Sequence, residues 1–237
     1  MNFFKQALAG AVFALSLSGI SHAGPMGGLQ ARDLDGNSAN GAEAYYDSTR
    51  DLTWLRAGSL NAMNWNDAKA WAEQDRFGLS GWRLPTMVDK GDDGFQFSIN
   101  GGDSGYNVDT SKASGSEMAH LYYDLLGNHA YYSPSSLFQP GFGLQNVGDF
   151  LNMAQEGYYW SGLSYGPDTT GAWLFQMSDG GQGWTFKFGH YYALAVIDGD
   201  VGVVPEPGTV ALAALGLLVL AGSRRGRRQA VASATPH

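Results

Sequence analysis

The amino-acid sequence predicts an α+β fold, and three observations support this prediction. Two segments carry apolar residues at helical spacing, one after Trp65 and one from Met118 to Leu125. From Gly157 onward, short aromatic segments alternate with glycine-bearing turns, a pattern typical of antiparallel strands. The 237 residues include 34 glycines, which predicts many loops. We therefore expect two helices, a mostly antiparallel twisted sheet and long loops.

The first 23 residues are typical of a secretory signal peptide. They contain a basic residue, then an apolar stretch, and they end in the small-x-small site Ser-His-Ala. We expect cleavage between Ala23 and Gly24. Residues 24–43 are small, polar and without periodicity, so we expect a leader or a loose first strand there. The folded domain is predicted to span residues 44–201.

The first half of the domain is predicted to form two short strands and a helix. Residues 44–47 and 51–55 are aromatic and apolar segments on either side of a turn, as in paired strands. Asn64 can cap a helix that starts at Trp65 and should stop near Phe77-Gly78. The strand residues expected to face the core are Tyr46, Leu52 and Trp54.

Residues 89–116 are predicted to form a long surface loop, because this segment combines low hydrophobicity with many glycines and aspartates. Calcium prefers carboxylate and carbonyl ligands, but the spacing matches no EF-hand and we favour a solvated loop. The histidines of the mature chain, His120, His129 and His190, show no metal-binding spacing. We therefore expect no metal ligands and no cofactor.

The second half is predicted to hold a helix followed by strands. Apolar residues at positions 118, 121, 122 and 125 share one helix face, and Gly127-Asn128 supplies a C-terminal stop. An antiparallel meander of four strands should follow, with the clearest alternation at Trp184, Phe186 and Phe188. The four expected strands are residues 158–161, 172–177, 183–188 and 191–197.

The C-terminal end combines three parts in a fixed order. Residues 202–208 are a linker that contains Pro205-Glu206-Pro207, and prolines cannot continue a helix from upstream. Residues 209–222 are apolar, with a length below the ~20 residues that span a bilayer comfortably. Residues 223–237 are a basic tail, which favours the cytoplasmic side. The arginines of this basic stop are Arg224, Arg225, Arg227 and Arg228.

This order resembles the PEP-CTERM sorting signal of bacterial surface proteins, in which Pro-Glu-Pro is recognised by a membrane-embedded exosortase. The resemblance implies that the exosortase and the secretion machinery are partners. It also implies that residues 209–222 are a transmembrane sorting helix that anchors the protein transiently, before it reaches the cell surface or the extracellular matrix. The alternative is an ordinary C-terminal membrane anchor preceded by a proline linker.

The composition excludes several classes of function. The formal net charge is −8, and loss of the signal peptide and the basic tail makes the mature part more acidic. This charge argues against nucleic acid and anionic lipid as partners. The chain has no cysteine, which excludes disulfides, thiol chemistry and cysteine-based metal sites.

Five motifs of the domain occur in the order seen in the Lcl C-terminal domain family, which residues 44–201 resemble. They are Asp51-Leu52-Thr53-Trp54-Leu55, Trp65-Asn66-Asp67-Ala68, Gly81-Trp82-Arg83-Leu84-Pro85-Thr86, Tyr159-Trp160-Ser161-Gly162 and Ala195-Val196-Ile197-Asp198-Gly199-Asp200. The resemblance implies a C-type-lectin-like fold related to the formylglycine-generating enzymes. One departure is Ile197, where the family usually has arginine.

The Trp-Arg-Leu-Pro stretch is predicted to be structural. Arg83 is expected to satisfy carboxylates or carbonyls with its planar guanidinium, with Asp47 or Asp51 as its partner. Contact between Arg83 and a ligand is the alternative. The motif residues assigned a structural role are Trp54, Trp82, Arg83, Leu84, Pro85 and Trp160.

Together these features favour an exported surface or extracellular-matrix protein without catalytic residues. The lectin-like resemblance and the aromatic content of 13% favour exopolysaccharide as a partner. The candidate contact residues, in loop-like surroundings, are Tyr131, Tyr132 and Tyr165. The alternative is an enzyme of the formylglycine-generating type, which fold analogy implies and the absence of cysteine disfavours. A purely structural matrix protein is a third interpretation.

Overall fold

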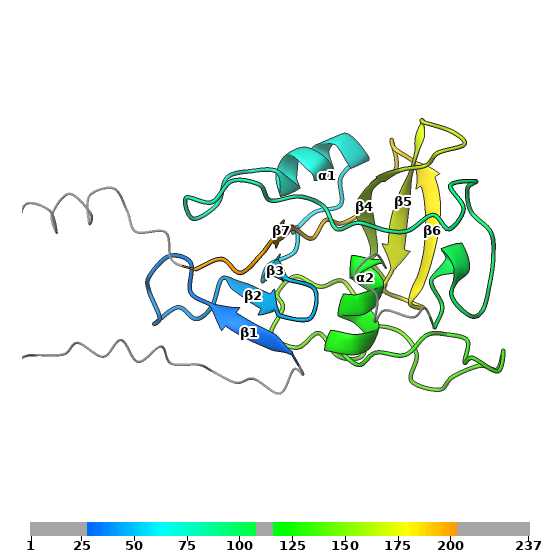
Figure 1. Ribbon diagram of the computed structural model, residues 1–237, viewed down its shortest axis with the longest axis horizontal. Coiled ribbons are helices and arrows are strands. Elements are labelled where there is room, and N and C mark those ends of the chain that lie inside the picture. Colours follow the sequence, from blue (N-terminus) through cyan, green and yellow to red (C-terminus); the bar gives the residue numbers. More distant parts are fainter. Residues whose placement is uncertain (1–27, 108–115, 203–237) are drawn as a thin grey trace, which may run out of the picture.

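The computed structural model of the chain describes residues 28–107 and 116–202 (Figure 1). Its elements are β1 (Leu29–Arg32), β2 (Ala44–Asp47), β3 (Leu52–Leu55), α1 (Trp65–Ala72), η1 (Gly102–Ser104), α2 (Glu117–His120), η2 (Leu121–Leu125), β4 (Tyr158–Ser164), β5 (Gly171–Gln176), β6 (Gly181–Phe186) and β7 (Val196–Asp198). Short helices and two antiparallel sheets confirm the α+β class. The expected signal peptide and sorting helix lie outside the described residues, among which no helix is long and apolar enough to cross a bilayer.

The first sheet has four antiparallel strands in the order β1-β2-β3-β7. Strand β7 comes from the end of the domain and pairs with β3, where Leu52 lies opposite Asp198. The last described residues lie on the left of Figure 1, where the side chain of Arg32, at the end of β1, reaches Asp200. Strand β1 lies within residues 24–43, so the sheet begins inside the stretch expected to be a leader or a loose first strand.

The second sheet is the meander β4-β5-β6, and it confirms the first three of the four expected strands. The expected pairing of the fourth strand, residues 191–197, with β6 is wrong. Tyr191 forms a bridge with Met63 instead, and the chain from Val196 onward joins β3. This segment connects the two sheets through long-range pairs, which a local sequence pattern cannot show.

Helix α1 begins as predicted and ends earlier. The Asn64 side chain accepts a backbone N–H of the first turn at 3.0 Å. The helix ends at Ala72, because residues 76–79 form a tight turn whose ends exchange backbone hydrogen bonds. In that turn Phe77 and Gly78 have φ values of 55° and 73°, outside the helical range. The predicted stop near these two residues is therefore the turn after the helix.

The second predicted helix is confirmed as α2 followed by the π-helix η2. The apolar residues expected on its inner face, at positions 118, 121, 122 and 125, are all buried. In η2 the Leu126 N–H donates to the carbonyl of Leu121, the wider spacing of a π-helix. This helix lies between the two sheets in Figure 1, and its buried side chains share one core cluster with Trp54 of the first sheet and Phe175 of the second.

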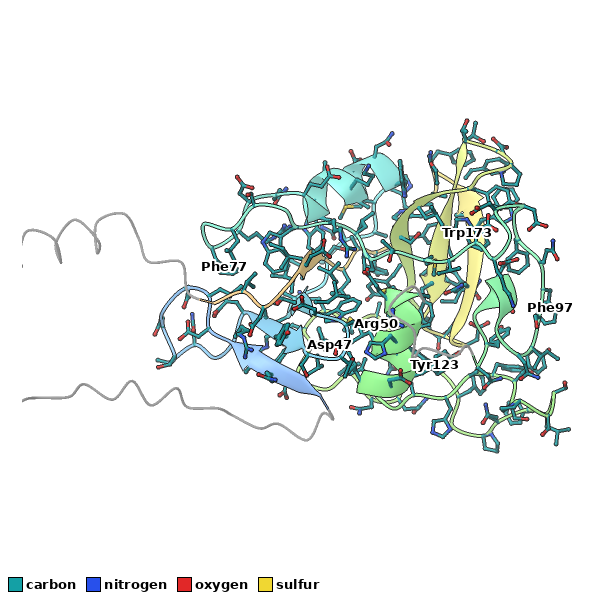
Figure 2. The ribbon with its side chains drawn as sticks, viewed as in Figure 1. Asp47, Arg50, Phe77, Phe97, Tyr123 and Trp173 are labelled. Carbon is teal, nitrogen blue, oxygen red and sulfur yellow. The ribbon has the colours of Figure 1, made fainter. Side chains whose placement is uncertain are left out.

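Two hydrophobic clusters fill the space between these elements. One surrounds Trp54 and Trp173, the latter labelled in Figure 2, and the other surrounds Trp82 and Trp160. These four tryptophans are at most 1% exposed, and Leu84 is 3% exposed. The apolar residues of the predicted structural motif are thus core residues.

The prediction that Tyr46 faces the core is wrong. Successive strand residues point to opposite faces, and Tyr45 and Asp47 occupy the face that α2 covers. Tyr46 is therefore on the other face, where its hydroxyl donates to Asp51 and Arg32 lies over its ring.

Candidate functional site

The guanidinium of Arg83 is the centre of an ion network. Its backbone is fixed first, because the Arg83 N–H and carbonyl each bond to Val196 of β7, at 2.8 and 2.9 Å. Its two terminal nitrogens then donate to the two carboxylate oxygens of Glu117, both at 2.8 Å, and one also donates to Asp198 at 2.6 Å. The predicted partners Asp47 and Asp51 are therefore wrong.

The Arg83 network connects the Trp-Arg-Leu-Pro stretch to the start of α2. Besides its two bonds to Arg83, Glu117 accepts the backbone N–H of Thr86 at 2.7 Å. Hydrogen bonding to Glu117 is the largest cause that raises the pKa of Arg83 above its ordinary value, so the guanidinium is charged at every accessible pH. Both terminal nitrogens of Arg83 are used inside the protein, and the arrangement supports a structural role.

A second polar cluster surrounds the buried imidazole of His120. One ring nitrogen lies 2.9 Å from Asp47 and the other lies 2.7 Å from Asp124. The hydroxyl of Thr49 lies 3.0 Å from the nitrogen that faces Asp47, an arrangement with the outline of a nucleophile, a base and an orienting acid. However, Thr49 donates its hydroxyl hydrogen to Asp47 at 2.5 Å.

The role of Asp47 decides what this cluster can do. Burial alone would raise the pKa of Asp47, but hydrogen bonds from His120 and Thr49 outweigh it, and the pKa lies below its ordinary value. Asp47 is thus an anion that takes one ring N–H and the threonine hydroxyl. The ring nitrogen has no lone pair left for Thr49, and the cluster serves to fix β2 against α2.

Among the described residues, two trios of carboxylates bring one oxygen of each residue within 4.8 Å of one another, close enough to share a cation. One trio lies within the predicted loop and contains Asp89 and Asp103. There Asp103 accepts the backbone N–H groups of Lys90 and Gln96, and Asp89 accepts the backbone N–H of Gly94. These bonds explain the positions of the carboxylates as turn-forming groups. The two trios are Asp89, Asp93 and Asp103, and Asp33, Asp35 and Glu43.

The three tyrosines predicted to contact a ligand lie in two separate aromatic groups. Tyr131 and Tyr132 belong to the 131–142 cluster, which we define as Tyr131, Tyr132, Phe138 and Phe142. Tyr165 belongs to the β6 aromatic strip, which we define as Tyr165, Trp184, Phe186 and Phe188. No ring contact among residues 28–107 and 116–202 joins the two groups. All three tyrosines are half-buried.

The 131–142 cluster borders an open cavity of about 290 Å³. The ring of Tyr131 meets that of Phe142 edge to face at 4.8 Å, and Phe142 lines the cavity. The other lining residues are Gly141, Gly143, Leu144, Gln145, Gln155, Glu156 and Ser178. Tyr131 therefore supports a cavity wall rather than projecting into solvent.

The β6 aromatic strip is more exposed. Tyr165 stacks on Trp184 at 4.1 Å with an interplanar angle of 5°, and Phe186 stacks on Phe188 at 5.4 Å and 7°. Phe186 is 44% exposed and Phe188 is 76% exposed. The predicted alternation holds for Trp184 and Phe186 within β6, whereas the strand ends at Phe186 and Phe188 lies two residues beyond it. The row of rings thus runs from the edge of the core into solvent.

The functional residues that the sequence did not reveal are those that long-range pairing brings together. Glu117 and Asp198 become partners of Arg83 only because β7 pairs with β3 and α2 packs beside them. The alternation of Trp184, Phe186 and Phe188 predicts that their rings share one face of a strand. It does not show whether that face is buried or exposed.

Comparison with known proteins concerns the C-terminal end. Residues 203–228 match the PEP-CTERM protein-sorting motif. The match includes Pro205, Glu206 and Pro207 and the four arginines of the basic stop, all outside the described residues. It supports an exported protein of the cell surface or the extracellular space that exosortase processes.

No curated protein and no solved structure matches the chain significantly. The resemblance of residues 44–201 to the Lcl C-terminal domain family, and with it a C-type-lectin-like fold, therefore stays a prediction.

Proposed function

We propose that the protein is a non-enzymatic component of the cell surface or the extracellular matrix that binds exopolysaccharide. In this proposal, the secretion machinery exports it and exosortase recognises Pro205-Glu206-Pro207. Residues 209–222 hold it briefly in the membrane, with residues 223–237 in the cytoplasm. The observation that carries the proposal is the sorting motif at residues 203–228.

The end of the domain supports this delivery route. Arg32 of β1 binds both carboxylate oxygens of Asp200, at 2.5 and 2.8 Å. The Gly199 N–H donates to Asp51 at 2.7 Å, and the hydroxyl of Thr53 donates to the Gly199 carbonyl at 2.7 Å. The fold is thus closed at residue 200, directly before the motif, and removal of the signal would leave the domain intact.

The described polar clusters support a role in binding or structure rather than catalysis. The donors of Arg83 and the hydroxyl of Thr49 are engaged by carboxylates of the domain. By contrast, the aromatic groups leave ring surface in contact with solvent, which is suited to sugar rings because aromatic faces attract polarised C–H groups. The formylglycine-generating alternative gains no support from these contacts.

The delivery route can be tested by cell fractionation and by mass spectrometry of the mature C-terminus. The variant replaces Pro205, Glu206 and Pro207 by alanine, with Asp75→Ala as a control at an exposed position of the domain. We expect the wild type and the control to leave the inner membrane without the four arginines, and the triple variant to keep them. The proposal fails if all three proteins keep the arginines and stay in the inner membrane.

The ligand can be tested separately on the processed protein recovered from producing cells. Retention on a panel of neutral and acidic polysaccharides should exceed retention on an uncoated matrix. Absence of retention on the whole panel would remove polysaccharide from the proposal and leave a purely structural matrix protein.

A further inference from the structure

The β6 aromatic strip is held rigidly from its inner end. The hydroxyl of Tyr165 accepts the backbone N–H of Phe95 at 3.2 Å, while its ring stacks on Trp184. Gly171 makes this stack possible, because a Cβ there would lie 2.9 Å from Trp184 and 3.1 Å from Tyr165. Gly171 is also the strand partner of Phe186, so no side chain covers that ring from β5.

Phe188 lies at the tip of a turn that is anchored by its neighbour. The Gly189 N–H donates to the Phe186 carbonyl at 2.9 Å, which closes a β-turn with Lys187 and Phe188 in its middle. The ammonium of Lys187 donates to Ser164 at 2.5 Å and lies 4.2 Å from the ring centroid of Trp65. The turn is therefore tied to the body of the domain by Lys187, and Phe188 projects from it.

Folding gives no reason for this arrangement. Turn tips are usually polar or glycine, and a phenylalanine that is 76% exposed gains little from burial. Among the described residues Phe186 is its only ring neighbour, so the stack continues toward solvent with one ring uncovered. Contiguous exposed apolar surface of this kind marks interaction sites.

The charges select one kind of occupant. The strip contains no carboxylate, and the amine of Lys187 is engaged inside the domain, so the strip itself is uncharged. The whole chain has a net charge of −8, which repels a polyanion and does not affect a neutral polymer. In Figure 1, β6 lies on the right and the last described residues lie on the left. The strand that carries the strip is thus far from the last described residues, which the sorting signal follows in the sequence.

We propose that the β6 aromatic strip binds a neutral β-linked polysaccharide of the glucan type, with Phe188 and Phe186 stacking on its sugar rings. This inference rests on the proposed function and names the site and the ligand class. A β-linked glucose ring carries its hydroxyl groups at the equator and presents C–H groups on both faces. These faces fit the negative face of an aromatic ring. A pre-organised stack loses little entropy when the polymer binds.

The test measures retention of the full processed protein on insoluble cellulose and its affinity for soluble hydroxyethyl cellulose. We expect Phe188→Ala to weaken binding by about tenfold, and the double change of Phe186 and Phe188 to alanine to abolish it. The matched control is Phe138→Ala, because Phe138 is 55% exposed and belongs to the 131–142 cluster. Phe138→Ala should leave binding to cellulose unchanged. The wild type should not be retained on the acidic polymer alginate.

The outcomes separate this inference from the proposed function. If the protein binds cellulose and Phe188→Ala and Phe138→Ala behave alike, the strip is not the site, while polysaccharide binding stands. If only acidic polysaccharides retain the wild type, the ligand class is overturned and the proposed function stands. Size-exclusion chromatography that shows a dimer in the wild type and a monomer in Phe188→Ala would assign the strip to a second copy and overturn the inference.

Discussion

The Arg83 network and the β6 aromatic strip are two ways in which this domain uses its most chemically distinctive side chains. Around Arg83, each charged group meets an opposite charge inside the protein, and Glu117 alone receives three hydrogen bonds. Along β6, the rings touch one another but leave Phe188 mostly in solvent.

The difference shows where binding capacity remains. A charge network whose donors are engaged by carboxylates of the same domain stabilises one structure and has few donors left to offer a ligand. An ordered row of rings with an uncovered end keeps its contact surface for a partner. The comparison predicts that the network determines stability and that the strip determines binding.

The largest effect is expected from Glu117→Ala. The change leaves the half-buried guanidinium of Arg83 with one carboxylate partner, the exposed Asp198, besides the Leu84 carbonyl, and it frees the Thr86 N–H. We expect a loss of about 3 kcal/mol in the free energy of unfolding, measured by urea denaturation of the processed protein. The control is Glu73→Ala on the surface of α1, which should change stability by less than about 0.5 kcal/mol. Equal effects of the two changes would contradict the structural role of the network.

An intermediate effect is expected from Gly171→Ala, which disturbs the inner end of the β6 aromatic strip. The added methyl group would meet Trp184 at 2.9 Å and force the stack of Tyr165 and Trp184 apart. We expect a loss of about 2 kcal/mol in stability, because overpacking of a core edge costs this much. Weaker binding to cellulose should accompany it. Gly166→Ala, where the added methyl meets nothing within 4 Å, is the matched control. If Gly171→Ala retains full binding, the rigidity of the strip is irrelevant to its function.

A smaller effect is expected in acid. The pKa of Asp47 is lower in the folded state than its ordinary value, so its contribution to stability is present above about pH 4 and is lost as the pH falls through the folded-state pKa. Asp47→Asn should therefore flatten the loss of stability as the pH falls below about 4. The measurement is the urea midpoint as a function of pH.

Asp179 serves as a control because its pKa is shifted in the direction opposite to that of Asp47. Burial raises its pKa, so the folded state takes up a proton at higher pH than the unfolded chain does, and this group adds stability as the pH falls. Asp179→Asn should make the acid loss steeper. A flatter acid limb in both variants would contradict the assigned causes.

The parts of the fold that the sequence predicted correctly depend on neighbouring residues. The cap at Asn64 and the buried face of residues 118–125 follow from helical spacing, and three strands follow from glycine turns and aromatic segments. The partners of Arg83 and the path of residues 191–198 depend on contacts between distant segments, which local spacing cannot show.

The candidate binding residues show the same limit. Tyr165 is part of an exposed aromatic group, but its neighbours Phe186 and Phe188 were expected only as strand residues. Their exposure depends on the register that places Gly171 opposite Phe186. Alternation predicts a shared face, and only the pairing of β5 and β6 shows that this face is open.

The most direct test of the comparison measures unfolding free energy and cellulose binding on the same two variants. Phe188→Ala should lose about tenfold in affinity and keep its stability within about 0.5 kcal/mol of the wild type, because the ring is exposed. Glu117→Ala, assayed at a temperature where it remains folded, should keep its affinity although it is less stable. The opposite pattern, with binding lost in Glu117→Ala and retained in Phe188→Ala, would contradict the account and assign function to the Arg83 network.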